Sequence, residues 1–344
     1  MTRQITTEQG FVDFYLDKRP NKNNFLDKVD ELINWQPVEK LLARNYRKTA
    51  AADGRPAYPA LPMFKMMLLQ RWYNLSDPGM EAAMYDRISF IRFVGLSFDS
   101  SVPDETTICR FRGELVKIGL HKKLLKQINS QLQARKLLVK DGAIIDATII
   151  SSSRRPRKVI EVIPEDRKED QAEKSGETEV AISFSDDSDA RWIKKGKQYH
   201  YGFKAHVATD KRGFVLGGHA TAANRSDTKE FERVVDALEL DEGSAVLADK
   251  GYTSAANSEI LARRKLSDGI MGKSYRGKKL SEPARQRNRQ ISGIRFVVEQ
   301  TFGLMKRQYQ FSRARYKGIA KVELELYLIS MALNIKKGAL MLST

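Results

Sequence analysis

The stretch AIIDATII, residues 143–150, divides this chain into two parts of different character. It is short, apolar and rich in isoleucine, which predicts a buried β-strand. Asp146 lies inside the run, and strand alternation puts it on the same face as Ile144 and Thr148. Burying an ionised carboxylate is costly unless a cation compensates it. Asp146 is therefore either one partner of a buried ion pair or a functional residue.

Residues 1–136, which precede this strand, have apolar side chains at helical spacing and predict an all-helical N-terminal domain for DNA binding or multimerisation. We expect Asp77 and Asp104 to cap two helices that end at Gly95 and Gly119. Consecutive short helices with basic residues are compatible with a helix-turn-helix-like DNA reader, and equally with a plain helical bundle. These basic residues are Arg110, Arg112, Lys122 and Lys123.

Strands and helices alternate after this domain, which predicts a mixed α/β domain over residues 137–320. The segments YHYGFKAHVATD and FVLGGHATAAN flank a turn and predict a hairpin, and SAVLADKGY predicts a second buried strand. A helix should begin with Asp227 as its cap and Glu230 completing a capping box. Residues 151–198 are polar, with their charges grouped in blocks, which indicates a mobile insertion. We expect residues 321–344 to form a C-terminal helix with apolar surface.

The charge balance indicates the class of partner. The chain has 60 Lys and Arg against 43 Asp and Glu, a net charge of +17, and residues 161–190 alone carry −8. The surplus elsewhere favours a polyanion such as double-stranded DNA, because neutralised phosphates release counterions, over a basic protein with merely solvated charges. A single cysteine, Cys109, excludes a disulfide framework. Without a membrane-spanning apolar run or a signal-peptide pattern, we expect a cytoplasmic, nucleoid-associated protein.

Two further acids stand in surroundings as unusual as those of Asp146. Asp249 closes the apolar strand AVLA, and Glu299 lies among apolar residues of a late helix. Asp249 could simply begin a turn, and Glu299 could simply pair with Arg295. Taken together, two carboxylates on neighbouring strands and one on a packed helix can converge on two divalent cations, an arrangement that serves phosphodiester displacement. Oxygen ligands favour Mg²⁺, with Mn²⁺ as a substitute.

Histidine-bound zinc is a weaker alternative, because His200, His206 and His219 lie near one another without thiolates or an HExxH spacing.

The late helix has basic surroundings. Arg295, Glu299, Phe302 and Lys306 recur at helical spacing and should share one face. An Arg295–Glu299 ion pair is worth only a few tenths of a kcal/mol and leaves Lys306 unexplained. The segment 273–289 holds seven basic residues and one acid, which suits a site that cleaves phosphodiesters of DNA. Its candidate DNA contacts are Arg276, Lys278, Lys279 and Arg285.

In this order and over most of the chain, these motifs resemble the DDE transposases of bacterial insertion sequences, specifically the family numbered five. RPAYPALPMFKMMLLQRWYNLSD and SVPDETTICRFR are similar to the N-terminal region of that family. Its catalytic region is similar to IIDATII, KKGKQYHYGFKAH, TAAN, LADKGY and RFVVEQTFGLMKRQYQFSRARYKG. The Arg-x3-Glu-x6-Lys spacing of the family is met by Arg295, Glu299 and Lys306, whereas Ser292 stands where the wider clade has a tyrosine.

The resemblance implies a ribonuclease H-like catalytic fold in which Asp146, Asp249 and Glu299 hold two Mg²⁺ ions. It also implies that Arg295 and Lys306 contact the DNA backbone near the cleaved phosphate. The implied reaction is cleavage at the terminal inverted repeats of an insertion sequence, followed by joining of the 3′ ends to target DNA. Transposases generally pair two ends, so the resemblance further implies a homodimer or a larger multimer on DNA.

Three more residues have two interpretations each. Lys204 and His206 either orient DNA or are ordinary strand residues that face solvent. Trp192 either stacks on a base or is a buried aromatic residue in a loop.

Two other functions also stay open: a metal-dependent nuclease that cuts without joining, and a DNA-binding regulator that has lost transposition.

Overall fold

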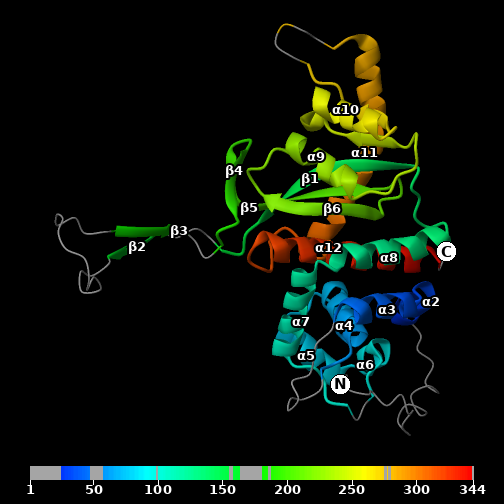
Figure 1. The fold of residues 1–344 in the computed structure, drawn as a ribbon, viewed down its shortest axis with the longest axis vertical. Helices are drawn as coiled ribbons and strands as arrows, with labels where there is room; N and C mark the ends of the chain where they lie inside the picture. The colour runs from blue at the N-terminus through cyan, green and yellow to red at the C-terminus, as the bar shows by residue number, and fades with distance from the viewer. Residues whose placement is uncertain are drawn as a thin grey trace.

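A helical N-terminal part and a six-stranded sheet with helices on both faces make up the protein (Figure 1). The computed structural model describes residues 25–46, 57–97, 100–154, 158–162, 180–184, 187–274, 277 and 280–342. The helices of the N-terminal part are α2 (Phe25–Leu32), α3 (Trp35–Asn45), α4 (Ala60–Trp72), α5 (Asp77–Asp86), α6 (Ile88–Val94), α7 (Glu105–Ile118) and α8 (His121–Ala134).

Strands and helices alternate in the second part, as the sequence predicts. Its strands are β1 (Gly142–Ser151), β2 (Lys158–Val162), β3 (Val180–Phe184), β4 (Arg191–Lys195), β5 (Gln198–Thr209), β6 (Val215–Ala222), β7 (Ala245–Ala248) and β8 (Ser267–Ile270). Its helices are α9 (Asp227–Asp236), the 3₁₀ turn η2 (Lys250–Tyr252), α10 (Ala255–Arg263), α11 (Glu282–Gln308) and α12 (Ile319–Met341).

Local signals in the sequence set the ends of α7. The carboxylate of Asp104 accepts a hydrogen bond from the backbone N–H of Thr107 at 2.6 Å, which satisfies an unpaired donor of the first turn. Gly119 follows the last turn with a φ of +61°, a conformation that glycine adopts without a Cβ penalty. Both predictions for this helix are confirmed.

The prediction for the region from Asp77 to Gly95 was wrong in two respects. Ser76 is the N-cap of α5, and the carboxylate of Asp77 instead pairs with the guanidinium of Arg112. The single predicted helix is two helices, α5 and α6, because the backbone at Arg87 is extended. Arg112 is thereby buried in an intramolecular ion pair, which favours the plain helical bundle over a DNA reader at this position.

The sheet is mixed, with β1 at its centre. β1 pairs antiparallel with β5 and parallel with β7, and β8 follows β7 in parallel. β5 pairs antiparallel with β6, which confirms the predicted hairpin, and its far end pairs with β4.

Helices cover the sheet on both faces, and successive side chains of β1 point alternately to one face and the other. Ile145 packs with Phe231 of α9 and Leu261 of α10 in one apolar cluster. Ile144 belongs to a larger cluster with Val298 of α11 and the residues of α12. Asp146 has the same parity as Ile144 and therefore faces α11.

α12 is a central element that both parts of the protein share. Every residue from Val322 to Ile335 is buried, as expected of a helix that is mostly apolar on all sides. In Figure 1, α12 runs with α8 between the sheet and the other N-terminal helices. The apolar surface that the sequence predicts for this helix is thus covered by the chain itself from Val322 to Ile335.

The predicted insertion at residues 151–198 contains strands. β2 and β3 pair with each other in a separate two-stranded sheet, which lies apart from the body in Figure 1. β4 joins the main sheet as an extension of its edge. Other parts of the insertion lie outside the described residues.

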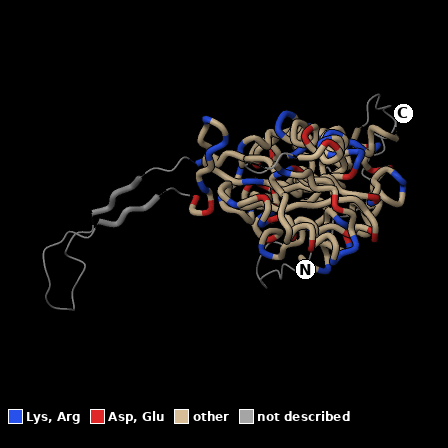
Figure 2. The backbone as a smooth tube through the Cα atoms, turned by 90° about the horizontal axis from the view of Figure 1, so that it is seen from above, with Lys and Arg blue, Asp and Glu red and all other residues tan. Residues whose placement is uncertain are grey.

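No helix in the described ranges is long and apolar enough to cross a membrane. Figure 2 shows Lys and Arg spread around the body of the molecule, with Asp and Glu interspersed. The surplus of positive charge is therefore not confined to a single face.

Candidate active site

The register of the sheet makes two of the predicted carboxylates neighbours. β1 and β7 run in parallel, and their pairing reaches Ile145 and Ala248. β7 ends there, so Asp146 and Asp249 are the next residues along two adjacent strands. Adjacent strands lie about 4.8 Å apart. The two acids therefore emerge together at the carboxyl end of β7, the edge where open α/β sheets bind ligands.

Arg295 of α11 lies between these two acids. Its Nη2 is 3.0 Å from Oδ2 of Asp146, and its Nη1 is 3.7 Å from Oδ1 of Asp249. Each carboxylate also accepts a hydrogen bond from the next backbone N–H, that of Ala147 at 2.8 Å and that of Lys250 at 2.6 Å. Only 7% of Arg295 is exposed, so the guanidinium is a nearly buried cation that two carboxylates share.

The electrostatics of Asp146 connect all three predicted acids. Burial raises the pKa of Asp146, and the charges of Asp249 and Glu299 raise it further, against the opposing effects of the Ala147 N–H and the Arg295 guanidinium. Asp146 is thus close enough to each of the other two acids to be repelled by its charge. Their surroundings favour additional positive charge, which is the condition for binding a cation.

Tyr252, in the turn after β7, is a neighbour of this site that the sequence did not single out. Its side chain is 1% exposed, and its hydroxyl makes no hydrogen bond to the described residues. Burial raises the pKa of Tyr252 far above 10, and the charges of Asp227, Asp146 and Asp249 raise it further. The available signal was its place in LADKGY, three residues after Asp249.

Glu299 lies on α11 one turn after Arg295, and it is exposed. The predicted alternative, an ion pair between Glu299 and Arg295, is absent from the ion pairs of the described residues, because Arg295 turns to the sheet instead. Within the described part of the chain, no three His, Cys, Asp or Glu side chains are close enough together to hold one metal ion. Asp146 and Asp249 therefore form the pre-assembled part of the site.

The four residues that the sequence places on one face of α11 differ in exposure. Arg295 and Phe302 are buried, Glu299 is exposed and Lys306 is half-buried. Burial lowers the pKa of Lys306, and repulsion by Lys195 of β4 lowers it further. Lys306 is seven residues from Glu299, which is about 10 Å along a helix.

The basic segment before α11 is described only in part. Arg276, Lys278 and Lys279 lie outside the described residues. Arg285 is exposed, with its guanidinium 3.3 Å from Glu282 of the same helix. It precedes Arg295 by ten residues, which places it about 15 Å away along α11.

Lys204 and His206 are buried, which contradicts the interpretation as strand residues that face solvent and argues against a direct contact with DNA. Lys204 is 6% exposed, and its Nζ donates to Oδ1 of Asp227 and to the carbonyl of Arg225, each at 2.8 Å. His206 is completely buried, and its Nε2 lies 3.1 Å from the hydroxyl of Thr221. Neither side chain faces solvent, so we no longer assign either a contact with DNA.

The neighbouring prediction of a capping box also failed. Asp227 is the first residue of α9 and pairs with Lys204, whereas Ser226 is the N-cap. Glu230 lies 3.0 Å from Nε2 of His219 and 2.9 Å from Nε of Arg225. Buried polar partners on β5 and β6 therefore compete successfully for both acids.

The histidines pack without assembling a zinc site. The rings of His206 and His219 stack with their centroids 4.9 Å apart, whereas His200 lies farther along β5. Across the described ranges, no group of three or more His, Cys, Asp or Glu side chains could hold a metal ion.

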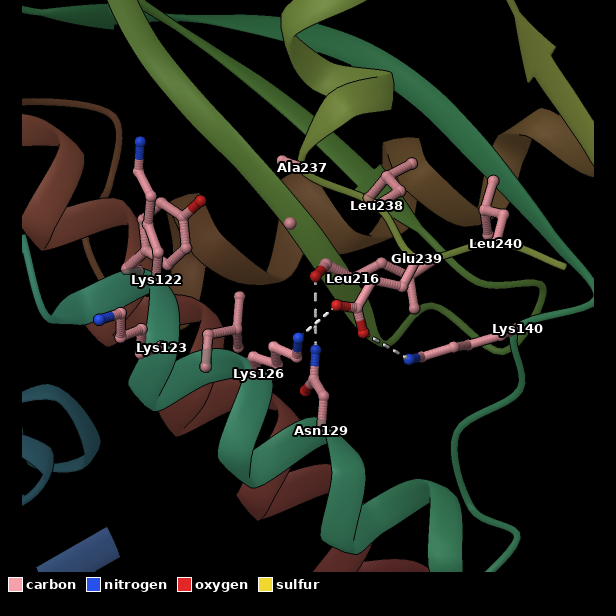
Figure 3. Close-up of a pocket in the computed structure, with 13 residues that line it drawn as sticks. Lys122, Lys123, Lys126, Asn129, Lys140, Leu216, Ala237, Leu238, Glu239 and Leu240 are labelled. Atoms are coloured by element: carbon pink, nitrogen blue, oxygen red, sulfur yellow. Dashed lines mark hydrogen bonds and ion pairs between the residues drawn. The ribbon is translucent and has the colours of Figure 1, made fainter. Parts of the chain in front are cut away.

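A pocket of about 200 Å³ lies elsewhere, between α8, β6 and the segment after α9 (Figure 3). Lys126 and Lys140 point toward Glu239, and Nζ of Lys140 lies 3.5 Å from it. Two of the basic side chains are thus already neutralised. None of the three predicted carboxylates lines this pocket, so we assign it no part in the site.

Trp192 is neither buried nor in a loop. It lies on β4 with 53% of its surface exposed.

Comparisons with known proteins match both parts of the chain. The family described as "Transposase DDE domain" matches residues 138–335, and the one described as "Transposase domain (DUF772)" matches residues 14–114. Among solved structures, the chain is similar to a piggyBac transposase synaptic complex with hairpin DNA, at 10% sequence identity and a TM-score of 0.40. That match covers 91% of this chain and 72% of the other.

Proposed function

This chain belongs to the transposase DDE family, and from that premise we propose that it cleaves DNA at the terminal inverted repeats of an insertion sequence and joins the 3′ ends to target DNA. One observation carries the proposal. The two acids at the end of β7 share the guanidinium of Arg295, and Glu299 on the same helix is close enough to interact with Asp146. The insertion-sequence family numbered five is the proposed subgroup.

We assign the catalytic part to the ribonuclease H-like fold. The support is the strand order: β6, β5 and β1 form an antiparallel meander, and β7 and β8 continue the sheet in parallel with β1. In this assignment the first acid lies on the central strand, the second follows the adjacent parallel strand, and the third lies on the helix that crosses them.

The donor set suits a hard divalent cation. Asp146, Asp249 and Glu299 offer carboxylate oxygens, and no His or Cys of the described residues completes a metal-binding group with them, which favours Mg²⁺ or Mn²⁺ over zinc. Arg295 already holds positive charge against the two strand acids, so the electrostatics of the site match a cation there. Bound magnesium would lower the pKa of water and stabilise the charge that develops on the phosphate.

The side chains would then act in two displacement steps. A water molecule attacks the phosphodiester at the transposon end, and the bond to the 3′ oxygen breaks to leave a 3′-hydroxyl. That hydroxyl attacks a phosphodiester of target DNA, displaces its 3′ oxygen and forms the new bond. Arg295, for which the resemblance implies a contact with the DNA backbone, would instead orient the acids, because it is nearly buried between them. Lys306 would bind a backbone phosphate. No Ser, Tyr or Cys nucleophile is required.

Two features of the proposal concern the whole assembly. Pairing of two transposon ends needs at least two active sites, so we propose a homodimer or larger multimer on DNA. Ser292 is exposed on α11, three residues before Arg295, at the position where the wider clade has a tyrosine. The contribution of that tyrosine would have to come from another residue or be dispensable here.

A strand-transfer assay tests the function. The full chain is incubated with Mg²⁺, a labelled transposon end and a supercoiled plasmid, and the products are separated by size. We expect cleaved end and a labelled joined product. Asp249→Asn should reduce both by at least about 10³-fold while DNA binding is retained, because it removes one oxygen ligand without changing shape.

The same assay separates the two other functions. Cleavage without a joined product would identify a nuclease and overturn the proposal. DNA binding without cleavage, in wild type as in Asp249→Asn, would identify a regulator. Full strand transfer by Asp249→Asn would show that the acids are assigned wrongly.

A further inference from the structure

The hairpin formed by β4 and β5 has a surface that the proposed site does not use. We define the 191–199 hairpin as residues 191–199, which comprise β4, a two-residue turn and the start of β5. Its sequence, RWIKKGKQY, has four basic residues and no acid. Gly196 takes a φ of +62° in the turn, so the two strands reverse tightly.

Aromatic rings line one face of this hairpin. Trp192 pairs across the strands with Tyr201, and their ring centroids are 5.2 Å apart. Lys194 pairs with Tyr199, and its Nζ is 5.4 Å from the centroid of that ring. Directly opposite residues project on the same side of a sheet. The row is open to solvent, because Trp192 is 53% and Tyr199 is 66% exposed.

The hairpin is anchored firmly at its base. The hydroxyl of Tyr201 donates to the carbonyl of Asp187 at 3.0 Å, which fixes the ring beneath Trp192. Gly202 next to it pairs with Ser151, the last residue of β1. The aromatic row is therefore attached to the strand that carries Asp146.

On the other face of the hairpin, Lys195 lies near α11. Lys195 lies close enough to Lys306 of α11 to repel its charge. Lys195 and Lys306 thus belong to one electropositive region. Among the described residues, no ion pair engages Lys194, Lys195 or Lys197, so these charges are available to a ligand.

We propose that the 191–199 hairpin binds an unpaired DNA strand, with bases stacked on Trp192 and Tyr199 and phosphates held by the basic residues. Exposed aromatic rings beside cations suit single strands, because a duplex buries the faces of its bases in its own stack. A like-charged hairpin of a second copy would be repelled. The identity of the ligand as DNA rests on the proposed function, in which cleavage creates strand ends.

Fluorescence and binding measurements test this proposal on the full chain in EDTA, which prevents cleavage. The probes are labelled oligo(dT) of 20 nucleotides and a blunt 20-base-pair duplex. The chain has three tryptophans, and the other two, Trp35 and Trp72, pack in the N-terminal helices. Oligo(dT) should therefore quench emission from Trp192, and Trp192→Phe should abolish that quenching while retaining most of the affinity.

The double variant Trp192→Ala/Tyr199→Ala should bind oligo(dT) about 10- to 100-fold more weakly, because stacking contributes substantially for each base. Its affinity for the blunt duplex should change by less than about threefold. Tyr85→Ala is the matched control, because Tyr85 is also 66% exposed but lies on α5. Circular dichroism verifies that each variant is folded.

The outcomes distinguish failure of the hairpin proposal from failure of the proposed function. If wild type binds both probes and the double variant loses neither, the hairpin proposal is overturned and the transposase function stands. If wild type binds neither probe, the proposed function itself is in error. If the double variant instead changes the sedimentation of the free protein, the row is an interface between proteins, which also overturns the proposal.

Discussion

Arg295 is the residue on which the charge balance of the site depends. Its guanidinium compensates two carboxylates that emerge from adjacent strands, and Asp146 has few other partners. In a buried ion pair, removal of one partner leaves the other charge without compensation. A divalent cation at these acids would perform the same compensation and would compete with Arg295.

Arg295→Gln should therefore make the protein more responsive to magnesium. Without Mg²⁺, loss of the guanidinium should destabilise the fold by about 2 kcal/mol, less than for a fully buried pair because Asp146 is partly exposed. Addition of MgCl₂ should raise the melting temperature of Arg295→Gln more than that of wild type, as measured by differential scanning fluorimetry. Arg285→Gln on the exposed part of α11 is the control. An equal response of all three proteins would contradict the competition.

His206 gives the protein a predictable dependence on pH. Burial lowers the pKa of His206 to about 2, assisted by the nearby His219 and Lys204. The folded protein thus keeps this imidazole neutral, whereas the unfolded chain binds a proton near pH 6.5. The contribution to stability is complete above pH 6.5 and is lost as the pH falls below it, at about 1.4 kcal/mol per unit.

Substitution of His206 by Gln should remove this contribution to the slope. The free energy of unfolding in urea, measured at pH 7.5 and pH 5.5, should fall less with acidification in His206→Gln than in wild type, by about 1 kcal/mol. The substitution itself lowers stability at both pH values, so the difference between the two is the relevant quantity. Equal differences in both proteins would mean that folding does not lower the pKa of His206.

At the scale of elements, a buried ion pair joins α4 to α12. Nη1 of Arg71 lies 3.2 Å from Oε1 of Glu325, and both side chains are 1% exposed. Arg71 also donates to the hydroxyl of Tyr316 at 2.7 Å, and Glu325 accepts from the backbone N–H of Arg315 at 3.0 Å. The carboxylate thus connects the helical part to the helix beneath the sheet.

Glu325→Leu should destabilise the protein by about 3–5 kcal/mol, because it leaves the charge of Arg71 buried and unpaired. The double variant Arg71→Met/Glu325→Leu should recover a large part of this loss, since two apolar side chains then meet. Urea unfolding of both variants measures the difference. As a reference, Lys117→Ala breaks the exposed pair with Glu114 and should change stability by less than about 1 kcal/mol. A double variant no more stable than Glu325→Leu would argue against the ion pair.

The elements that the sequence predicted well are those with local signals. Asp104 and Gly119 mark the ends of α7, and the isoleucine-rich run marks β1, because capping and apolar patterning depend on neighbours in the chain. The break at Arg87 was missed because apolar residues continue across it. β4 was missed because three of its five residues are basic and it forms by pairing with β5, which no local pattern reveals.

The candidate site shows the same division. Asp146 and Asp249 were identified because an acid next to an apolar strand is conspicuous in sequence. Their adjacency depends on the register between β1 and β7, which are about a hundred residues apart. The burial of Lys204 also depends on a distant element, because α9 packs against β5 and supplies Asp227 as its partner.

At the scale of the whole molecule, α12 makes the two parts one cooperative unit. Gly338 near its end faces the N-terminal helices, where an added Cβ would lie 2.9 Å from Cδ2 of Leu32 and 3.1 Å from Cδ2 of Leu132. The residues before it also contact the sheet, since Asn334 accepts from the backbone N–H of Val215 at 2.8 Å. Disturbance at one side of the helix should therefore reach the other.

Gly338→Val should lower the stability of both parts together, by about 1–3 kcal/mol, because the extra methyl groups overpack the contact with α2 and α8. In a Trp192→Phe background, tryptophan fluorescence reports Trp35 and Trp72 of the helical part, and hydrogen exchange of β1 reports the sheet. Both probes should give the same midpoint in urea and shift equally. Gly113→Ala in α7 is the control, because a Cβ there meets no atom within 4 Å. A shift confined to the helical part would mean that the sheet folds on its own, and that α12 belongs to the sheet alone.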